Sequence, residues 1–210
     1  MAMNPIIRAL ILSDMWMVTG WGLIGPIFAI FAERIPGGSV FVAGIASAIF
    51  LLVKSFTQIP FARWSDKLNN RKTFIVIGYS LFVLVPLGYI YVTNVWQLYL
   101  IQVLEGLGAA LSYPAWLAVF SHHVDPAKEG YEWSVYMTGT GLGSAATAAI
   151  GGAVADFFGY NMLFIVVAVT QVAGMVVIYL SDIPDGSKLK PHLIGHKGKL
   201  VHGRHSHRHA

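Results

Sequence analysis

Three ionisable side chains stand inside long apolar stretches of this sequence: Asp14, Lys54 and Glu105. A charged residue at the centre of a membrane helix costs roughly 2.5–3.5 kcal/mol on insertion scales, so such residues usually face a cavity or a partner. At a rise of about 1.5 Å per residue, Asp14 and Lys54 lie at similar depth near one membrane face, and Glu105 lies roughly 10 Å deeper. We therefore expect that Asp14 and Lys54 can form a pair and that Glu105 is the lone acid at its level.

Glu105 has the chemistry of a proton carrier, because loss of water around a carboxyl group favours its protonated form. Helical spacing places three polar or aromatic residues on the same face, namely Gln102, Ser112 and Trp116. This stripe indicates a water-filled path for a substrate. The alternative is a neutral, hydrogen-bonded Glu105 that locks helices together. For Asp14 and Lys54 the alternative to a substrate contact is a structural ion pair.

Trp21 is placed on the same path by the glycines around it. It stands in the run Gly20-Trp21-Gly22, and Gly25-Pro26 follows. Glycine and proline make this helix deformable, and interrupted helices often mark the binding segments of transporters.

The elements that must position these residues are membrane helices. Of 210 residues, 56% are hydrophobic and 11% are charged, whereas a soluble domain carries about 25% charged residues. A bilayer-spanning helix needs about 20 mostly apolar residues. Six segments meet this requirement: Ile6–Phe31, Ser39–Phe61, Thr73–Val92, Val95–Phe120, Trp133–Ala155 and Tyr160–Leu180. The expected fold is an all-α polytopic membrane protein with one six-helix domain over residues 1–182.

The stretch Ala62–Lys72 is the most highly charged segment before the C-terminal tail. It cannot lie in hydrocarbon, so we interpret it as a tight polar turn between the second and third helices. Lys and Arg gather in this turn, at Arg8, at Lys128 and in the tail, while the opposite connections hold only Arg34. Because positively charged loops stay in the cytoplasm, the sequence predicts cytoplasmic N- and C-termini and a place in the cytoplasmic (inner) membrane.

The predicted fifth helix carries a stripe of small residues at a spacing of four, formed by Gly139, Gly143, Thr147 and Gly151. Small residues at this spacing let two membrane helices approach closely. Two interpretations stay open, a packing seam within one chain and a seam between two subunits.

Residues 183–210 form a second region of different composition. No acid follows Asp185, and six histidines interrupt a run rich in Lys and Arg: His192, His196, His202, His205, His207 and His209. We expect a disordered cytoplasmic tail attracted to anionic lipid headgroups, each basic residue near the surface contributing about 1 kcal/mol. A His-rich tract can also capture a metal ion, and a solubilising tail is the simpler interpretation.

Other chemistries find no support in the sequence. There is no cysteine, which excludes disulfides, thiolate metal sites and cysteine nucleophiles. His122 and His123 are adjacent and have no third ligand, and the run Gly139–Gly143 has neither a preceding strand nor a following lysine. We expect no enzyme, no metal site and no cofactor. The positive charge is local to the tail, so no nucleic-acid partner is expected.

The stretch Ala62–Lys72 resembles the signature loop of the major facilitator superfamily, Gly-x-Leu-Ala-Asp-Arg-x-Gly-Arg-Arg/Lys. Asp66 falls on the aspartate of that motif and Lys67 on the basic residue after it, and Arg71 and Lys72 fall on its basic end. The run Gln102–Ala110 resembles the fourth-helix motif Arg-x-x-Gln-Gly-x-Gly-Ala-Ala, with Gln102 in place of the arginine and Glu105 in place of the glutamine. The glycines of the predicted fifth helix resemble the Gly-rich motif of the antiporter subgroup.

This resemblance implies one half of a twelve-helix transporter, with alternating access around a central cavity lined by helices one and four. Two copies would then rebuild a complete transporter of a small solute, with proton coupling through Glu105 as an open option. The loop residues Asp66, Lys67, Arg71 and Lys72 would form a cytoplasmic gate. In a dimer, Asp66 would meet the helix start near Tyr131 of the second copy. The alternatives are a half that works only with a different half-transporter, a non-transporting membrane interaction protein and a truncated piece of a full-length transporter. Aromatic residues near the path give a mild preference for a hydrophobic or amphipathic solute.

Overall fold

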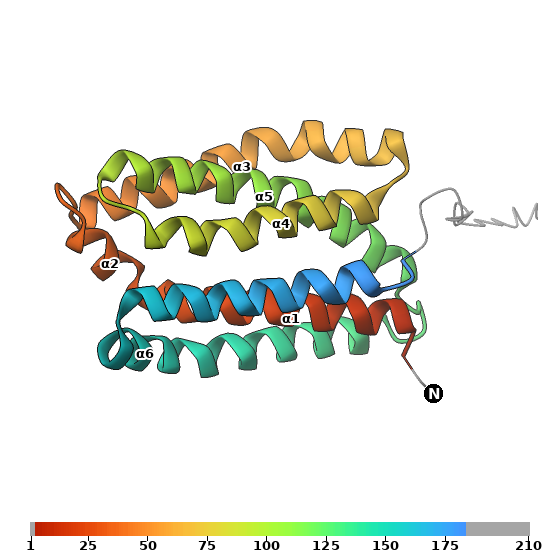
Figure 1. The fold of residues 1–210 in the computed structure, drawn as a ribbon. Coiled ribbons are helices and arrows are strands. Elements are labelled where there is room, and N and C mark those ends of the chain that lie inside the picture. Colours follow the sequence, from red (N-terminus) through yellow and green to blue (C-terminus); the bar gives the residue numbers. More distant parts are fainter. Residues whose placement is uncertain (1–2, 184–210) are drawn as a thin grey trace, which may run out of the picture.

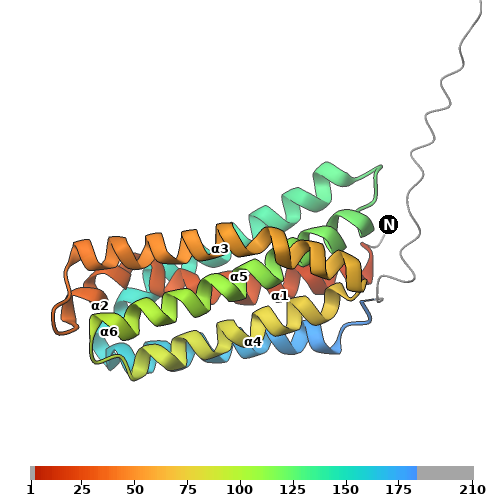
Figure 2. The same ribbon diagram turned by 90° about the horizontal axis from the view of Figure 1, so that it is seen from above.

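The computed structural model describes residues 3–183, and this part of the chain is all-helical. Figures 1 and 2 show the helices lying side by side in one elongated bundle. In chain order the elements are α1 (Pro5–Ile24), the short 3-10 helix η1 (Gly25–Ile27), α2 (Phe28–Arg34), α3 (Val40–Leu68), α4 (Arg71–Ile90), α5 (Val95–His123) and α6 (Glu129–Leu180). Among the described residues, five helices are long and apolar enough to cross a membrane, with α1, η1 and α2 counting as one of them.

Polar residues before the apolar runs set the helix starts. Four side-chain oxygens accept a hydrogen bond at 3.0–3.2 Å from the backbone N–H two or three residues further on, those of Asn4, Ser39, Asn70 and Asn94. Each satisfies one of the N–H groups that the first turn of a helix leaves without a partner. These four caps explain why α1, α3, α4 and α5 begin where they do.

The charged stretch between α3 and α4 is mostly helix, so the prediction of a tight turn over Ala62–Lys72 is wrong in its extent. α3 continues to Leu68, and the reversal is made by Asn69 and Asn70 alone. Asn69 adopts the left-handed conformation with φ 53°, which asparagine tolerates better than most residues. Hydropathy marks where a helix leaves the apolar layer, and this helix continues beyond that point.

The helix α6 is 52 residues long and contains one non-helical residue, Gly159, with φ 81° and ψ 167°. Glycine has no Cβ and adopts such a backbone without steric cost. The chain reverses its direction there, so that the two parts of α6 run antiparallel (Figure 1). The reversal lies between the predicted fifth and sixth segments, Trp133–Ala155 and Tyr160–Leu180.

The polar connections gather at the two ends of the bundle. The N-terminus, the α3–α4 turn, the α5–α6 connection and the end of α6 lie at one end (Figure 1). A hydrogen bond of 2.6 Å from Lys72 Nζ to the carbonyl oxygen of Ser181 joins two of these connections. Of the basic residues that the sequence assigned to one membrane face, those that the structure describes therefore lie at one end of the bundle.

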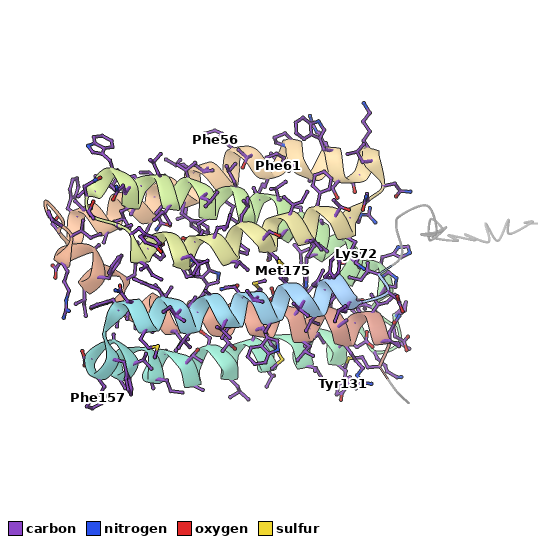
Figure 3. The ribbon with its side chains drawn as sticks, in the orientation of Figure 1. Phe56, Phe61, Lys72, Tyr131, Phe157 and Met175 are labelled. Carbon is purple, nitrogen blue, oxygen red and sulfur yellow. The ribbon has the colours of Figure 1, made fainter. Side chains whose placement is uncertain are left out.

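The bundle packs α1 against both α6 and α5, while α5 packs on α3 and α4, and α4 packs on α6. The helix α3 is the most exposed of the five long apolar helices, since only 11% of its most apolar 18-residue stretch is buried. Phe56 on α3 and Phe157 on α6 point away from the bundle (Figure 3). Apolar side chains facing outward from apolar helices are what a lipid-embedded protein presents. The predicted tail and its histidines lie outside the described residues.

Candidate functional site

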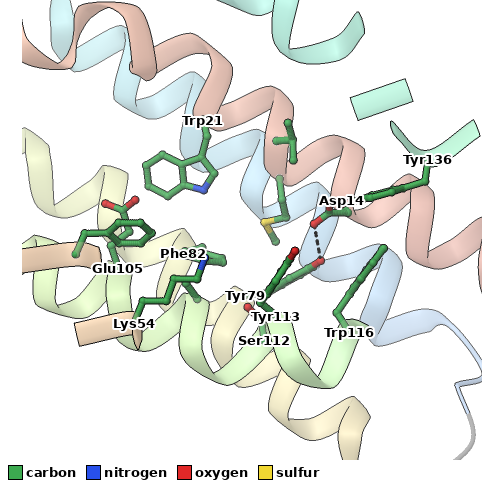
Figure 4. Close-up of a pocket in the computed structure, with 14 residues that line it drawn as sticks. Asp14, Trp21, Lys54, Tyr79, Phe82, Glu105, Ser112, Tyr113, Trp116 and Tyr136 are labelled. Atoms are coloured by element: carbon green, nitrogen blue, oxygen red, sulfur yellow. Dashed lines mark hydrogen bonds between the residues drawn. The ribbon is translucent and has the colours of Figure 1, made fainter. Parts of the chain in front are cut away.

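A cavity of about 320 Å³ lies inside the bundle, and five helices line it: α1, α3, α4, α5 and α6. Its charged lining residues are Asp14, Lys54 and Glu105, the three that the sequence singled out. Figure 4 shows them around a space walled by aromatic side chains. The aromatic residues of the wall are Trp21, Phe50, Tyr79, Phe82, Tyr113, Trp116 and Tyr136. Titratable groups converging in a mostly apolar pocket are the usual form of a small-molecule site.

Two tyrosines hold the Asp14 carboxyl. Tyr136 on α6 donates its hydroxyl to Oδ2 at 2.8 Å, and Tyr79 on α4 donates to Oδ1 at 3.4 Å. Tyr79 is buried, with 2% of its surface exposed. The carboxyl of α1 is thus fixed by two other helices, and neither of its partners is a cation.

Lys54 does not form the predicted ion pair with Asp14. Its ammonium lies 5.0 Å from the ring centroid of Tyr113 and 5.9 Å from that of Phe50. The described part of the chain has two ion pairs, neither of which includes Lys54. Both Asp14 oxygens are occupied by hydroxyls from α4 and α6, whereas Lys54 on α3 lies against an α5 ring. The two residues line one cavity without pairing.

Glu105 lies between two cavities. It borders the cavity of Asp14 and a second one of about 400 Å³ that is lined by residues of α1, η1, α2, α3, α4 and α5. Trp21 and Phe50 border both spaces as well. The carboxyl of Glu105 accepts one hydrogen bond, from the hydroxyl of Tyr89 at 3.3 Å. It is therefore reached from both cavities, and its protein partner is a neutral hydroxyl.

The polar stripe expected along α5 divides between the two cavities. Ser112 and Trp116 line the first and Gln102 lines the second. The Ser112 hydroxyl donates to the carbonyl oxygen of Gly108 at 2.8 Å. Gln102 Oε1 and the indole nitrogen of Trp116 are buried, and no residue between 3 and 183 gives either of them a hydrogen bond.

Three tyrosines donate hydrogen bonds to the carboxyls of the candidate site, and the sequence did not predict them. Tyr79, Tyr89 and Tyr136 stand in the apolar runs and were read only as part of those runs. A signal existed, because a buried tyrosine hydroxyl usually needs a hydrogen-bond partner. Tyr79 near the middle of α4 and Tyr89 close to its end could therefore have been matched with the acids of neighbouring helices.

Residues of the predicted gate loop form their contacts within the same chain. Arg71 forms an ion pair of 2.9 Å with Asp66, whose side chain is 62% exposed. An exposed pair of this kind contributes about 0–1 kcal/mol. Lys72 bonds to Ser181 as described, and Lys67 is exposed. The contact of Asp66 with a second copy near Tyr131 stays a prediction.

The small-residue stripe of α6 faces α1 of the same chain. A Cβ added at Gly139 would lie 2.9 Å from Met15 Sδ, and one at Gly143 would lie 3.0 Å from Thr19 Oγ1. A Cβ at Gly151 would collide with the backbone carbonyl of Leu23. These glycines therefore form a packing seam within the chain, the first of the two interpretations above. In the described part of the chain no group of three or more His, Cys, Asp and Glu residues is placed to hold a metal ion.

Comparison of the sequence with known proteins identifies a family and several relatives. The family model of the Major Facilitator Superfamily matches residues 10–206. The chain is 28% identical over 134 residues to the proton-coupled antiporter flippase LtaA of Staphylococcus haemolyticus, a match covering 63% of this chain and 34% of the relative. It is 29% identical over 143 residues to the MFS-type transporter YitZ of Bacillus subtilis, covering 68% of this chain and 85% of the relative. It is 21% identical over 180 residues to the multidrug resistance protein MdtG of Proteus mirabilis, covering 84% and 44%. The matches thus span less than half of two of these relatives and most of the third.

Proposed function

The chain belongs to the Major Facilitator Superfamily, and on this premise we propose that it is a secondary transporter of a small solute, proton-coupled through Glu105. It works by alternating access around the cavity of Asp14, Lys54 and Glu105, as a dimer of six-helix halves. The observation that carries the proposal is the place of Glu105 between the two cavities with a tyrosine hydroxyl as its partner. Its relative LtaA is named a proton-coupled antiporter.

A proton carrier must change its charge without losing its place in the fold. A buried carboxyl hydrogen-bonded to a hydroxyl can do so, because the hydroxyl donates to the carboxylate and can accept from the acid. A carboxyl locked to a cation would not release its charge so readily. Glu105 has the first kind of partner, Tyr89, and borders space on both sides. This favours proton transfer over the alternative of a helix lock.

The proposal takes the chain to cross the membrane six times, and the reversal at Gly159, which divides α6 into two antiparallel parts, supports it. An even number of crossings leaves both chain ends on one side. The basic α3–α4 turn lies at the same end of the bundle as the N-terminus, and basic connections stay in the cytoplasm. We infer an inner-membrane protein with the N-terminus and the end of α6 on the cytoplasmic side.

The proposal of a dimer is based on the exposed face of α3. Large apolar side chains of this helix are exposed along its length: Phe41, Leu51, Leu52, Phe56 and Ile59. The cavities border the same helix, through Ser47, Phe50 and Lys54. A second copy related by a two-fold axis would cover this face and enclose the cavity, as the second half does in a twelve-helix transporter.

The proposal is tested with purified chain in proteoliposomes under an imposed pH gradient, with ethidium as a cationic dye and 8-anilino-1-naphthalenesulfonate as an anionic one. The wild-type chain should move at least one dye faster than protein-free liposomes, and Glu105→Gln should abolish the pH-driven part. Glu33→Gln is the matched control, because Glu33 is exposed and lies outside the cavities. Undiminished pH-driven flux by Glu105→Gln removes Glu105 from the mechanism. A strictly monomeric active species, measured by light scattering, contradicts the dimer.

A further inference from the structure

Lys54 differs from the other charged residues of the cavity in its partners. Asp14 and Glu105 each accept tyrosine hydroxyls. The Lys54 ammonium lies over the rings of Tyr113 and Phe50 and forms no ion pair or hydrogen bond that the described residues provide. Aromatic faces attract a cation but accept none of its three N–H groups as an oxygen would. The ammonium therefore has N–H donors at the wall of a cavity, and no described residue accepts a hydrogen bond from them.

A second donor of the same cavity also has no acceptor. The indole N–H of Trp116 has no hydrogen-bond partner among the described residues, and the residue is 2% exposed. Trp116 lies three residues after Tyr113, one of the two rings beneath Lys54. A buried polar group without a partner is costly, and a ligand atom can supply what the protein does not. Two lining donors without acceptors favour a ligand group rich in acceptor oxygens.

The rest of the wall is suited to an apolar body. Trp21, Phe50 and Phe82 line the cavity together with Met17 and Val18. A cation at one point of the cavity and an apolar, aromatic wall elsewhere match a ligand that has an acidic group and an apolar body, which is an anionic amphiphile.

The two carboxyls of the cavity do not prevent an anion from binding. Asp14 is engaged by hydroxyls of Tyr79 and Tyr136. When Glu105 carries the proton that the proposed function requires, Asp14 and Lys54 leave the cavity without net charge. A single anion bound at Lys54 then meets no net negative charge, so proton loading and anion binding support each other.

We propose that Lys54 binds the carboxylate, sulfonate or phosphate group of an anionic amphiphile whose apolar part lies against Trp21, Phe50 and Phe82. This substrate class rests on the proposed function, because it takes the cavity to be the path of the solute. Without a solute, the ammonium lies against the rings of Tyr113 and Phe50. When a solute binds, its acidic group accepts hydrogen bonds from the free N–H groups of the ammonium.

The test is equilibrium binding to the purified chain in lipid nanodiscs, with empty nanodiscs subtracted. The two probes are 8-anilino-1-naphthalenesulfonate and N-phenyl-1-naphthylamine, which share their rings and differ by the sulfonate. We expect Lys54→Gln to weaken binding of the sulfonate dye roughly tenfold and to leave that of the neutral dye within about twofold, as for the loss of one charge-assisted hydrogen bond. Lys54→Arg should retain the preference for the sulfonate. The control is Arg63→Gln, an exposed cation on the same helix outside both cavities.

Unchanged neutral-dye binding shows that the cavity of Lys54→Gln is intact. The inference is overturned if the wild-type chain does not bind the sulfonate dye, if Lys54→Gln leaves its affinity unchanged, or if both dyes weaken equally. Binding needs no transport, so the two proposals fail separately. Selective, Lys54-dependent binding without flux of either dye contradicts only the proposed function, and flux of ethidium without such binding contradicts only this inference.

Discussion

At the scale of residues, tyrosine hydroxyls rather than cations hold the two buried carboxyls in position. Asp14 is bonded to Tyr136, which is 122 positions away in the sequence, and to Tyr79. Glu105 is bonded to Tyr89. A hydroxyl partner orients a carboxyl in either protonation state, whereas a cationic partner favours the charged one. The site therefore holds its acids in position and leaves their charge free to change.

The bond between Asp14 and Tyr136 should be measurable as a coupling between α1 and α6. In a double-mutant cycle of Asp14→Asn and Tyr136→Phe, we expect a coupling free energy of about 0.6–1.7 kcal/mol, the range of hydrogen bonds between membrane helices. The measurement is reversible unfolding in mixed micelles. Tyr131→Phe, an exposed tyrosine of the same helix, should show no coupling to Asp14→Asn. A coupling no larger than that of this control would show that the hydrogen bond is not formed.

The sequence identified the acids and the lysine of the site but not their partners. A charge within an apolar run is visible without a structure, because its insertion cost demands an explanation. Which side chain meets it depends on the rotation of neighbouring helices about their axes, which hydropathy does not fix. Depth along the membrane suggested that Asp14 and Lys54 could pair. Rotation instead turned Asp14 toward Tyr79 and Tyr136.

At the scale of elements, the seam between α1 and α6 determines where Asp14 and Tyr136 stand. Gly151 and Gly143 allow α6 to lie against the backbone and side chains of α1. In a membrane such close approach is the main source of helix association, since lipid tails are as apolar as the side chains. The same seam brings Tyr136 to Asp14, so the packing of the two helices sets the geometry of the cavity.

Two adjacent glycines offer a matched test of this seam. A Cβ at Gly151 would collide with the Leu23 carbonyl, whereas one at Gly152 would meet nothing within 4 Å. Gly151→Ala should destabilise the fold by about 1–3 kcal/mol, the usual cost of overpacking. Gly152→Ala should be neutral or stabilising by up to about 1 kcal/mol, because alanine favours the helix. Thermal unfolding in detergent measures both, and equal effects of the two substitutions would contradict the seam.

The all-helical class and the places of the apolar segments could be predicted from the sequence, and the ends of the helices less well. The segment Ser39–Phe61 marked the apolar part of α3, but the helix runs to Leu68. The last residues of α3 are polar and still helical, since a helix end is set by capping groups such as Asn69 rather than by hydropathy. Gly159 lies between the predicted segments Trp133–Ala155 and Tyr160–Leu180, and glycine permits the backbone that a sharp reversal needs.

At the scale of the whole molecule, an all-helical bundle of apolar helices carries a cavity with three ionisable residues. The basic connections lie at one end and apolar side chains cover the outside. We propose that this arrangement forms a transport path around Glu105 that opens in turn to the two sides of the membrane. A path of this kind must be wet, and it must be reached from both sides.

The most direct measurement is the reaction of a cysteine at Val18 with a membrane-impermeant charged maleimide. Val18 lines the cavity, and the chain has no cysteine of its own. Leu84→Cys is the control, because Leu84 is 51% exposed on the apolar surface of α4 and a thiol in hydrocarbon does not form the reactive thiolate. Alternating access predicts that Val18→Cys reacts with reagent applied to either side of sealed vesicles, much faster than Leu84→Cys. Reaction from one side only, or at the slow rate of the control, would contradict the account.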